Sequence, residues 1–158
     1  MVDCDQILPD LYVGTYPQGF EDIQELKKRL RVSAVLNLQT DHDIRERGMD
    51  WKMLETHYRE LDIEIHRVPM RDFDYDDQEE KLPEAVSVLS KLLTSGHVVY
   101  LHCNAGTGRS PLVAMAYLHW CRKMTLEEAV SYVKERRPSF PNEELLLTRP
   151  KTHLDNSC

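Results

Sequence analysis

Short apolar runs along the chain alternate with longer stretches in which apolar residues recur at helical spacing. Residues 32–38 and 97–103 are rich in β-branched and other apolar side chains, as expected of strands buried on both faces, and residues 63–70 form a further predicted strand. The shorter run at residues 11–13 is typical of an edge strand. The pattern therefore predicts strands that alternate with helices.

The stretches between these runs have the spacing of amphipathic helices. Helices are predicted over residues 20–30, 49–61, 79–93, 109–121 and 126–136. Thr125 and Glu128 form the pattern of a capping box at the start of the last one, and a further short helix is expected after Pro141. Such an alternation predicts an α/β fold with a central, mostly parallel sheet flanked by helices. Ligands bind at the carboxyl ends of such strands.

The length and composition suit a folded globular domain. A chain of 158 residues can bury a substantial apolar core, and we expect a single domain over residues 1–158 with its core at about 7–147. The formal net charge of −7 argues against a nucleic acid or an anionic membrane as partner, because both require a basic surface. No segment is apolar for long enough to span a bilayer.

The cysteines lie at positions 4, 103, 121 and 158, without the close spacing of metal ligands, and the histidines are not paired either. We therefore expect no metal and no cofactor. A chain of this length does not need disulfides, so a reducing compartment fits best. We expect a cytoplasmic protein, and a plastid location after removal of a transit peptide stays open. The polar tail from Arg149 onward is expected to have no function.

The most informative segment runs from His102 to Ser110 and reads HCNAGTGRS. It lies between a predicted buried strand and a predicted helix, so it forms a strand-to-helix turn. The free N–H groups at the start of a helix point outward together and can bind an anion. Gly106 and Gly108 allow backbone angles that other residues avoid, and they allow a ligand to approach closely. A phosphoryl group fits such a site.

Three side chains of this segment suggest chemistry as well as binding. Cys103 lies at the strand end, where the N–H groups, the helix dipole and Arg109 all favour a thiolate. The planar guanidinium of Arg109 can bind two phosphoryl oxygens, and Ser110 can donate a hydrogen bond to a departing thiolate. The amides that would hold the phosphoryl group belong to Asn104, Ala105, Gly106, Thr107 and Gly108. The alternative is an ordinary buried cysteine.

A thiolate that attacks a phosphate ester needs an acid to protonate the leaving oxygen. Asp72, where the predicted strand at residues 63–70 gives way to a polar loop, is the best candidate, and Asp74 and Asp76 are its rivals. The alternative is that this acidic run is a solvated loop that caps the helix starting near Glu79.

The order His-Cys, five residues, Arg-Ser resembles the signature of the dual-specificity cysteine phosphatases. Within that branch the chain is most similar to the glucan phosphatases, the group that contains laforin and the plant starch-excess enzymes. The segments GHVVYLHCNAG at 96–106 and LPEAV at 82–86 resemble laforin. The segments RDFD at 71–74, RSP at 109–111 and SFP at 139–141 resemble the plant enzymes. The likeness extends over about residues 7–147.

The resemblance implies a dual-specificity phosphatase fold with Cys103 as nucleophile and Asp72 as general acid. It also implies that Phe73 and Phe140 help to line an aromatic channel for a sugar chain. Trp51 is a further candidate for sugar binding. Ordinary core packing is the alternative for each of the three rings. The chain has no room for a carbohydrate-binding module, so sugar binding would come from the catalytic domain alone.

The expected function is hydrolysis of phosphate monoesters through a phospho-cysteine, with phosphorylated glucan as the substrate. One alternative is a protein phosphatase that acts on phosphotyrosine and on phosphoserine or phosphothreonine with the same chemistry. Another is a module that binds a phospho-ligand or a glucan without catalysis. The chain departs from the resemblance at Glu46 and Arg47, where the plant enzymes carry aromatic residues.

Overall fold

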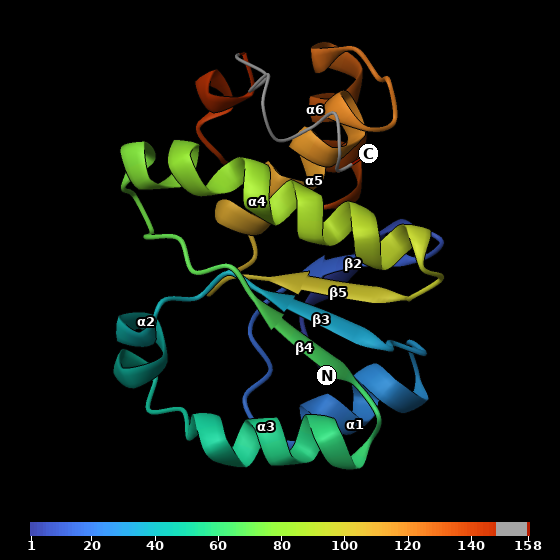
Figure 1. The fold of residues 1–158 in the computed structure, drawn as a ribbon, viewed down its shortest axis with the longest axis vertical. Coiled ribbons are helices and arrows are strands. Elements are labelled where there is room, and N and C mark those ends of the chain that lie inside the picture. The colour runs from blue at the N-terminus through green and yellow to red at the C-terminus, as the bar shows by residue number, and fades with distance from the viewer. Residues whose placement is uncertain (148–157) are drawn as a thin grey trace.

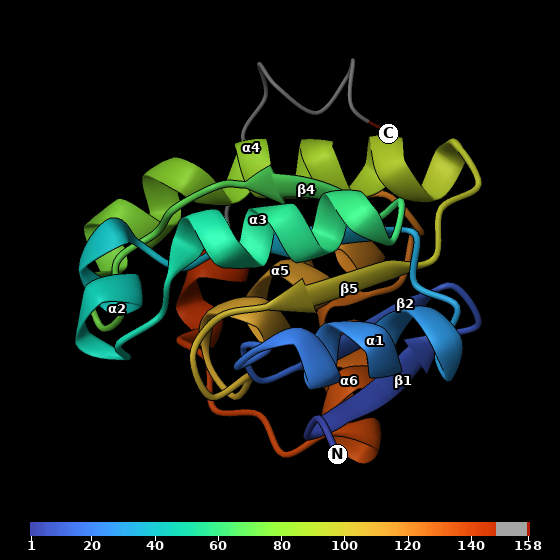
Figure 2. The same cartoon turned by 90° about the horizontal axis from the view of Figure 1, so that it is seen from below.

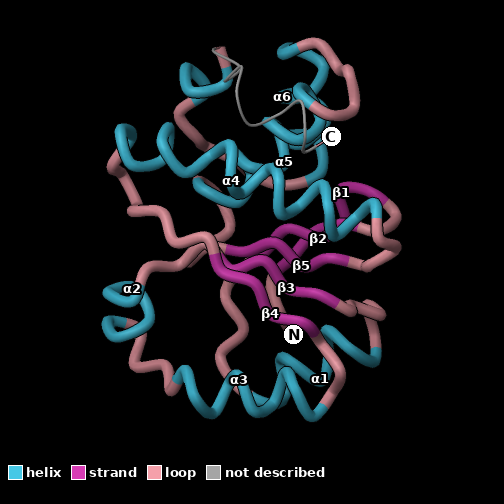
Figure 3. Tube along the Cα trace, in the orientation of Figure 1, coloured by secondary structure: helices cyan, strands magenta, loops and turns pink. Residues whose placement is uncertain are grey.

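The computed structural model describes residues 1–147 and 158, and a single five-stranded sheet forms its centre (Figure 3). The strand order across the sheet is β1-β2-β5-β3-β4. The strands are β1 Cys4–Leu8, β2 Leu11–Gly14, β3 Ala34–Asn37, β4 Glu64–Arg67 and β5 Val99–His102. β1 and β2 are antiparallel, and every other neighbouring pair is parallel. The predicted mostly parallel sheet is confirmed, with β5 in the middle.

Helices cover both faces of this sheet (Figures 1 and 2). They are α1 Phe20–Lys28, α2 Asp41–Glu46, α3 Trp51–Glu60, α4 Tyr75–Thr94, α5 Arg109–Trp120, α6 Leu126–Arg136 and the 3-10 helix η1 Glu143–Leu146. α4, α5 and α6 lie on one side of the sheet, and α1 and α3 lie on the other. The short helix α2 lies beyond the end of the sheet to which the arrows of β3, β4 and β5 point.

A hydrophobic cluster packs against each face of the sheet. Leu36 of β3 and Leu101 of β5 belong to the cluster that includes α4 and α5, whereas Val35 and Tyr100 belong to the cluster that includes α1 and α3. Successive strand side chains point to opposite faces, so a strand covered on both sides must be apolar throughout. This explains why the central strands appear in the sequence as continuous apolar runs.

The sequence pattern does not predict strand β1, whose five residues CDQIL are partly polar. Because β1 pairs with β2, the segment at residues 11–13 is an inner strand, and the edges of the sheet are β1 and β4. The expectation of an edge strand at residues 11–13 is therefore wrong. The cause is that a half-exposed edge strand has too few apolar positions to stand out.

Two helices near the carboxyl ends of the strands also differ from the expectation. Helix α2 was too short to show a helical period, and a capping box between Thr40 and Asp43 starts it. Helix α4 begins at Tyr75 instead of near residue 79, because the side chain of Asp74 accepts the N–H of Asp77 and caps it. The acidic run after residue 71 therefore belongs partly to a helix start.

The C-terminal part of the chain confirms two expectations and contradicts a third. The capping box of Thr125 and Glu128 is confirmed, and η1 is the expected short helix after residue 141. Cys121 and Cys158 form a disulfide, although the sequence analysis expects a chain without one. Residues 149–157 of the tail lie outside the described residues.

The described residues contain neither a membrane-spanning helix nor a cluster of metal-binding side chains. No helix among them has the length and apolar character that a transmembrane span requires. Within the same residues, no three histidine, cysteine or acidic side chains are grouped closely enough to bind a metal ion.

Candidate active site

The carboxyl ends of the parallel strands β3, β4 and β5 lie side by side at the same end of the sheet (Figure 1). β5 ends at His102 and α5 begins at Arg109, so residues 103–108 connect the central strand to a helix. We call residues 103–109 the cradle. The strand-to-helix turn predicted for this segment is confirmed.

The carbonyl groups of residues 104–107 in the cradle are all engaged by segments outside it. The donors are Tyr16 N–H to Asn104 at 3.1 Å, Arg137 Nη2 to Ala105 at 3.1 Å, Arg137 Nε to Gly106 at 2.6 Å and Phe140 N–H to Thr107 at 2.7 Å. Four successive carbonyls are thus fixed by neighbours, which sets the orientation of the peptide units between them.

The N–H groups of the same peptide units are free. Among residues 1–147, no backbone or side-chain acceptor receives the N–H of any residue from 104 to 108. A backbone N–H without a protein partner is costly unless water or a ligand accepts its hydrogen bond. The cradle therefore offers a set of unused donors beside the N-terminus of α5, an arrangement that suits an anion with several oxygens.

Arg137 is the residue that sequence reasoning missed here. Its side chain is 2% exposed, and besides the two cradle carbonyls its Nη1 contacts Asp3 at 3.2 Å and Asp5 at 2.9 Å. The carboxylates lie in or next to β1, which was not predicted, so no local pattern linked them to the end of α6. Arg137 ties the back of the cradle to the opposite terminus of the chain.

The two glycines of the cradle have different roles. Gly106 has φ +72°, and a Cβ there would lie 2.5 Å from the carbonyl of Gly14 and 2.8 Å from Arg137 Nη2. Gly108 has a negative φ of −118°, and nothing lies within 4 Å of the place a Cβ would take. The expected demand for special backbone angles therefore holds for Gly106 only.

The thiol of Cys103 lies deep in the cradle, with 3% of the residue exposed. Its Sγ is 3.3 Å from Ser110 Oγ, so the hydroxyl can donate to a thiolate as expected. Asn104 lines a cavity of about 660 Å³, and Gly108 and Arg109 line a second, smaller cavity. Cys103 itself lines neither cavity, and both cavities border other residues of the cradle.

Arg109 is 1% exposed, and only part of its guanidinium is satisfied. Nη1 donates to Asp43 at 2.7 Å and to the carbonyl of Met70 at 2.8 Å. Within the described residues, Nε and Nη2 have no hydrogen-bond partner. A buried guanidinium with one anchored side and free N–H groups is prepared to bind two oxygens of a phosphoryl group.

Asp43 was not singled out from the sequence, because it belongs to the unpredicted helix α2. Burial alone would raise the pKa of Asp43, but hydrogen bonds from Arg109 and from the N–H of Thr40 hold that pKa below its usual value. Asp43 also accepts a hydrogen bond from Asn104 Nδ2 at 3.1 Å. One ionised carboxylate therefore positions both the guanidinium and the first residue after the cysteine.

The structure separates Asp72 from its rivals. Asp72 Oδ2 lies 3.5 Å from Arg109 Nη2, and Asp72 lines both cavities at the cradle. Asp74 caps α4 and lies 3.6 Å from Arg71, whereas Asp76 is exposed in the first turn of that helix. Of the three carboxylates, Asp72 is the one that contacts Arg109 and lines the cavities at the cradle.

His102 precedes the cysteine and is buried. Its Nδ1 donates to the carbonyl of Cys103 at 3.0 Å, and within the described residues its Nε2 has no partner. Burial lowers the pKa of His102 to about 4, in spite of this hydrogen bond, so the ring is neutral near pH 7. A neutral, anchored imidazole at this position orients the backbone of the cradle.

Phe73 and Phe140 come together at the site, as the resemblance implied. They are 81% and 79% exposed, and both line the cavity beside Gly108 and Arg109. Phe73 has φ +60°, a conformation that is rare for a bulky residue. Two rings exposed to this degree next to the cradle are not core residues.

Trp51 does not join them. It lies at the start of α3, packs against the cluster that includes α1 and α3, and has the guanidinium of Arg67 5.1 Å from its ring centre. It lines none of the cavities described at the cradle. The interpretation of Trp51 as a sugar-binding residue is therefore not supported, and packing against the core accounts for its position.

Comparisons with known proteins agree with this geometry. The family described as dual specificity phosphatase, catalytic domain, matches residues 11–148. Phosphoglucan phosphatase DSP4 of Castanea sativa is 36% identical over 137 residues, covering 85% of this chain and 36% of that protein. Laforin of Mus musculus is 32% identical over 144 residues, covering 85% of this chain and 44% of that protein. The chain thus spans less than half the length of these relatives.

Solved structures share the fold at lower identity. PTPMT1 in complex with PI(5)P has a TM-score of 0.74 with 21% identity, covering 89% of this chain and 88% of that one. Kinase associated phosphatase also has a TM-score of 0.74, with 17% identity over 92% of this chain and 89% of that one. The match over residues 11–148, together with the cradle geometry, shows that the chain belongs to the dual specificity phosphatase family.

Proposed function

We propose that the protein hydrolyses phosphate monoesters through a phospho-cysteine. The thiolate of Cys103 attacks phosphorus, the bond from sulfur to phosphorus forms and the ester bond breaks, while Asp72 gives its proton to the leaving alcohol oxygen. Arg109 and the amides of residues 104–108 bind the equatorial oxygens as charge spreads in the transition state.

The second step restores the enzyme. Asp72 takes a proton from water as the water oxygen attacks phosphorus, the bond between sulfur and phosphorus breaks, and inorganic phosphate leaves. Ser110 donates a hydrogen bond to the departing thiolate from 3.3 Å. No step requires a metal.

One observation carries this proposal above the others. The carbonyls of residues 104–107 are all engaged from outside the cradle, while within the described part of the chain the adjoining amides and the Nε and Nη2 groups of the buried Arg109 have no hydrogen-bond partner. These donors lie in the same short segment as Cys103. A merely structural loop would have no reason to leave so many donors unsatisfied.

For the substrate we propose a phosphorylated glucan. The support is the pair of exposed rings, Phe73 and Phe140, beside the cradle, since flat apolar rings stack on sugar faces at little cost in entropy. Two of the relatives are named phosphoglucan phosphatases, DSP4 and the chloroplastic LSF1 of Arabidopsis thaliana, the latter 31% identical over 128 residues.

Phosphoproteins are the alternative substrate. The observation that favours them is the 30% identity over 132 residues with dual specificity protein phosphatase 5 of Rattus norvegicus. The chemistry at Cys103 would be the same, and only the use of the surface around the cradle would differ.

The test compares phosphate release from phosphorylated amylopectin, a phosphotyrosine peptide and a phosphoinositide, after enzyme amounts are matched on an aryl phosphate. We expect the highest rate on amylopectin. A preference for the peptide would refute the glucan assignment and leave the mechanism intact. Cys103→Ser is the control, and release of phosphate by that variant at the normal rate would refute the mechanism.

A further inference from the structure

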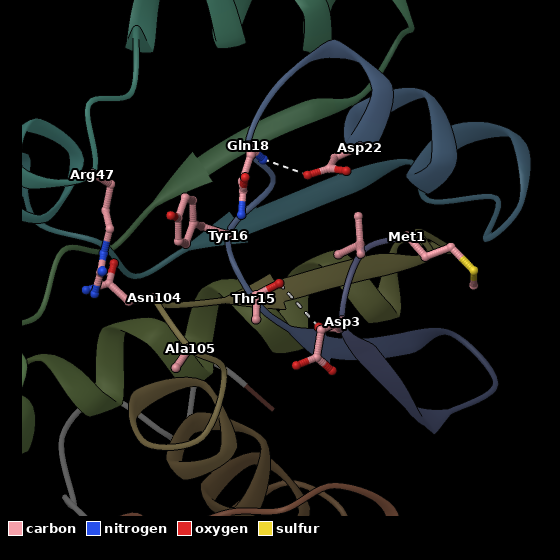
Figure 4. A pocket seen from close by; sticks show the side chains of 10 residues that line it. Met1, Asp3, Thr15, Tyr16, Gln18, Asp22, Arg47, Asn104 and Ala105 are labelled. Atoms are coloured by element: carbon pink, nitrogen blue, oxygen red, sulfur yellow. Dashed lines mark hydrogen bonds between the residues drawn. The ribbon is translucent and has the colours of Figure 1, made fainter.

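Arg47, which directly follows α2, borders three cavities of the described structure. One is the cavity of about 660 Å³ that it shares with Asp72 and Phe73. A second, of about 310 Å³, contains Tyr16 and Gln18 and is drawn in Figure 4. Asn104 of the cradle lines both of these cavities. Arg47 therefore lies where the space around the cradle continues into a neighbouring cavity.

The guanidinium of Arg47 has a defined platform. It lies over the ring of Tyr16, 5.8 Å from the ring centre. Tyr16 is itself tied to the cradle, because its N–H donates to the carbonyl of Asn104 at 3.1 Å. A guanidinium that stacks on an aromatic ring keeps the N–H groups on its edges available for another partner.

Within the described residues neither Arg47 nor Arg45 has an ion-pair partner, whereas three other cations nearby are paired. In this part of the chain no carboxylate lies within 4.0 Å of the Arg47 guanidinium, and none of its N–H groups has a hydrogen bond there. The three other cations are paired as follows: Arg71 with Asp74 at 3.6 Å, Arg67 with Asp41 at 3.0 Å and His42 with Glu46 at 3.4 Å.

The acidic residues of the smaller cavity are already engaged. Asp22 accepts the N–H of Gln18 at 2.8 Å, and Asp3 contacts Arg137 at 3.2 Å (Figure 4 draws the first of these). Four carboxylates line the larger cavity, and each contacts a cation other than Arg47: Asp41 contacts Arg67, Asp43 and Asp72 contact Arg109, and Glu46 contacts His42. In a chain with a net charge of −7, the guanidinium of Arg47 is thus a positive group that these acids do not pair, and it can attract an anion.

We propose that Arg47, held on Tyr16, binds a second anionic group of the substrate while the cradle holds the phosphoryl group that is cleaved. This inference rests on the proposed phosphatase function and narrows its substrate class to molecules with two neighbouring anionic groups. The second group is a phosphate or a carboxylate, because a guanidinium edge binds either through paired hydrogen bonds. A neutral sugar is less suited to this position, since the guanidinium already covers a face of the tyrosine ring.

The experiment measures kcat/KM on matched substrates for three proteins: wild type, Arg47→Ala and Arg45→Ala. Arg45 lies in α2, two residues before Arg47, is exposed and borders none of the three cavities, so it controls for the loss of one positive charge. Two pairs of substrates test whether the second anionic group is a phosphate or a carboxylate. One is an oligoglucan with one phosphate or with two neighbouring phosphates, and the other is a phosphotyrosine peptide without or with a neighbouring carboxylate.

The readout is the preference for the two-anion member of each pair. We expect Arg47→Ala to reduce this preference about tenfold, mainly through KM, and Arg45→Ala to leave it at the wild-type value. The preference should also fall as salt is added, because the contact is exposed. Tyr16→Leu should reduce it as well, whereas Tyr16→Phe, which keeps the ring, should not.

Equal preferences in wild type and Arg47→Ala would overturn the inference, and so would equal losses in Arg47→Ala and Arg45→Ala. Failure of the proposed function looks different, because the wild-type protein would then release no phosphate from any of the substrates. A wild type that is active on an aryl phosphate but indifferent to the second anion refutes only the subsite.

Discussion

The back of the cradle and the rim around it are built in opposite ways. We call three buried groups the base: Arg137 and Asp43, which hold the cradle from outside, and Arg109, the last residue of the cradle, which pairs with Asp43. We call the exposed groups beside the opening of the cradle, Asp72, Phe73, Phe140 and Arg47, its rim. The base has several hydrogen bonds for each side chain, whereas the rim has few. A structure of this kind fixes the chemistry and leaves the choice of substrate to exposed side chains.

Energetics explain the division. A buried charge or carbonyl that loses its partner costs about 1–3 kcal/mol or more, so each group of the base depends on the others. An exposed contact contributes about 0–1 kcal/mol, so a rim residue can change without harm to the fold. Changes in the base should therefore reduce stability, and changes in the rim should alter rate or specificity.

The largest effect that we expect comes from Asp72, the rim residue that takes part in the chemistry. Asp72→Asn should lower kcat about 10²- to 10⁴-fold, because the leaving oxygen loses its proton donor. The free energy of unfolding should stay unchanged. Steady-state rates and denaturant unfolding test this, and an Asp72→Asn variant with the wild-type kcat would assign the acid elsewhere.

In the base, Arg137→Leu should cost about 2–4 kcal/mol of unfolding free energy and much of the activity. The change leaves the carbonyls of residues 105 and 106 without their donors. Glu135→Gln, an exposed change two residues earlier in α6, should stay within about 0.5 kcal/mol of wild type. Denaturant unfolding measures both, and equal stability of the two variants would show that Arg137 does not support the cradle.

Acid should weaken the fold through His102, which is buried beside the cradle and bonds to the carbonyl of Cys103. Its pKa is about 4 in the folded protein, against about 6.5 in an unfolded chain, so the unfolded state binds more protons between these values. The free energy of unfolding should therefore fall by about 3 kcal/mol as pH drops from about 6.5 to about 4. Unfolding curves across this range should show the loss in wild type. His102→Gln should lack this part of the slope, and a parallel slope in that variant would contradict the assignment.

The smallest effect concerns the backbone of the rim at Phe73. Its positive φ costs a residue with a side chain about 1–2 kcal/mol, which glycine avoids. Phe73→Gly should therefore be about 1 kcal/mol more stable than Phe73→Ala, while both lose the same contact with a sugar chain. Thermal unfolding compares their stability, and a more stable alanine variant would argue against strain at this position.

Features formed by residues that are close in sequence could be predicted, whereas the base could not. Apolar periodicity located the inner strands and the long helices, because burial on both faces leaves a strong pattern. The cradle was predictable because its glycines, cysteine and arginine are adjacent in the chain. Asp72 followed from its place at a strand end together with the resemblance.

The base was not predictable in the same way. Arg137 donates to the carbonyl of Gly106, which lies 31 residues earlier in the sequence. It also contacts Asp5, which lies 132 residues earlier. Asp43 acts across a separation of 66 residues from a helix too short to show a period. Contacts at such separations depend on the sheet order, which brings β1 and α6 together, and no local pattern contains that order.

The phospho-cysteine is the central claim, and trapping it is the most direct test. With an aryl phosphate whose phenol leaves without protonation, Asp72→Asn should accumulate the intermediate, because the first step then needs no acid while the water of the second step is no longer activated. Mass spectrometry of the acid-quenched reaction should then find the mass of one phosphoryl group on the peptide that contains Cys103. Turnover of substrate with that cysteine never modified, or a phosphoryl group found on a different residue, would contradict the account.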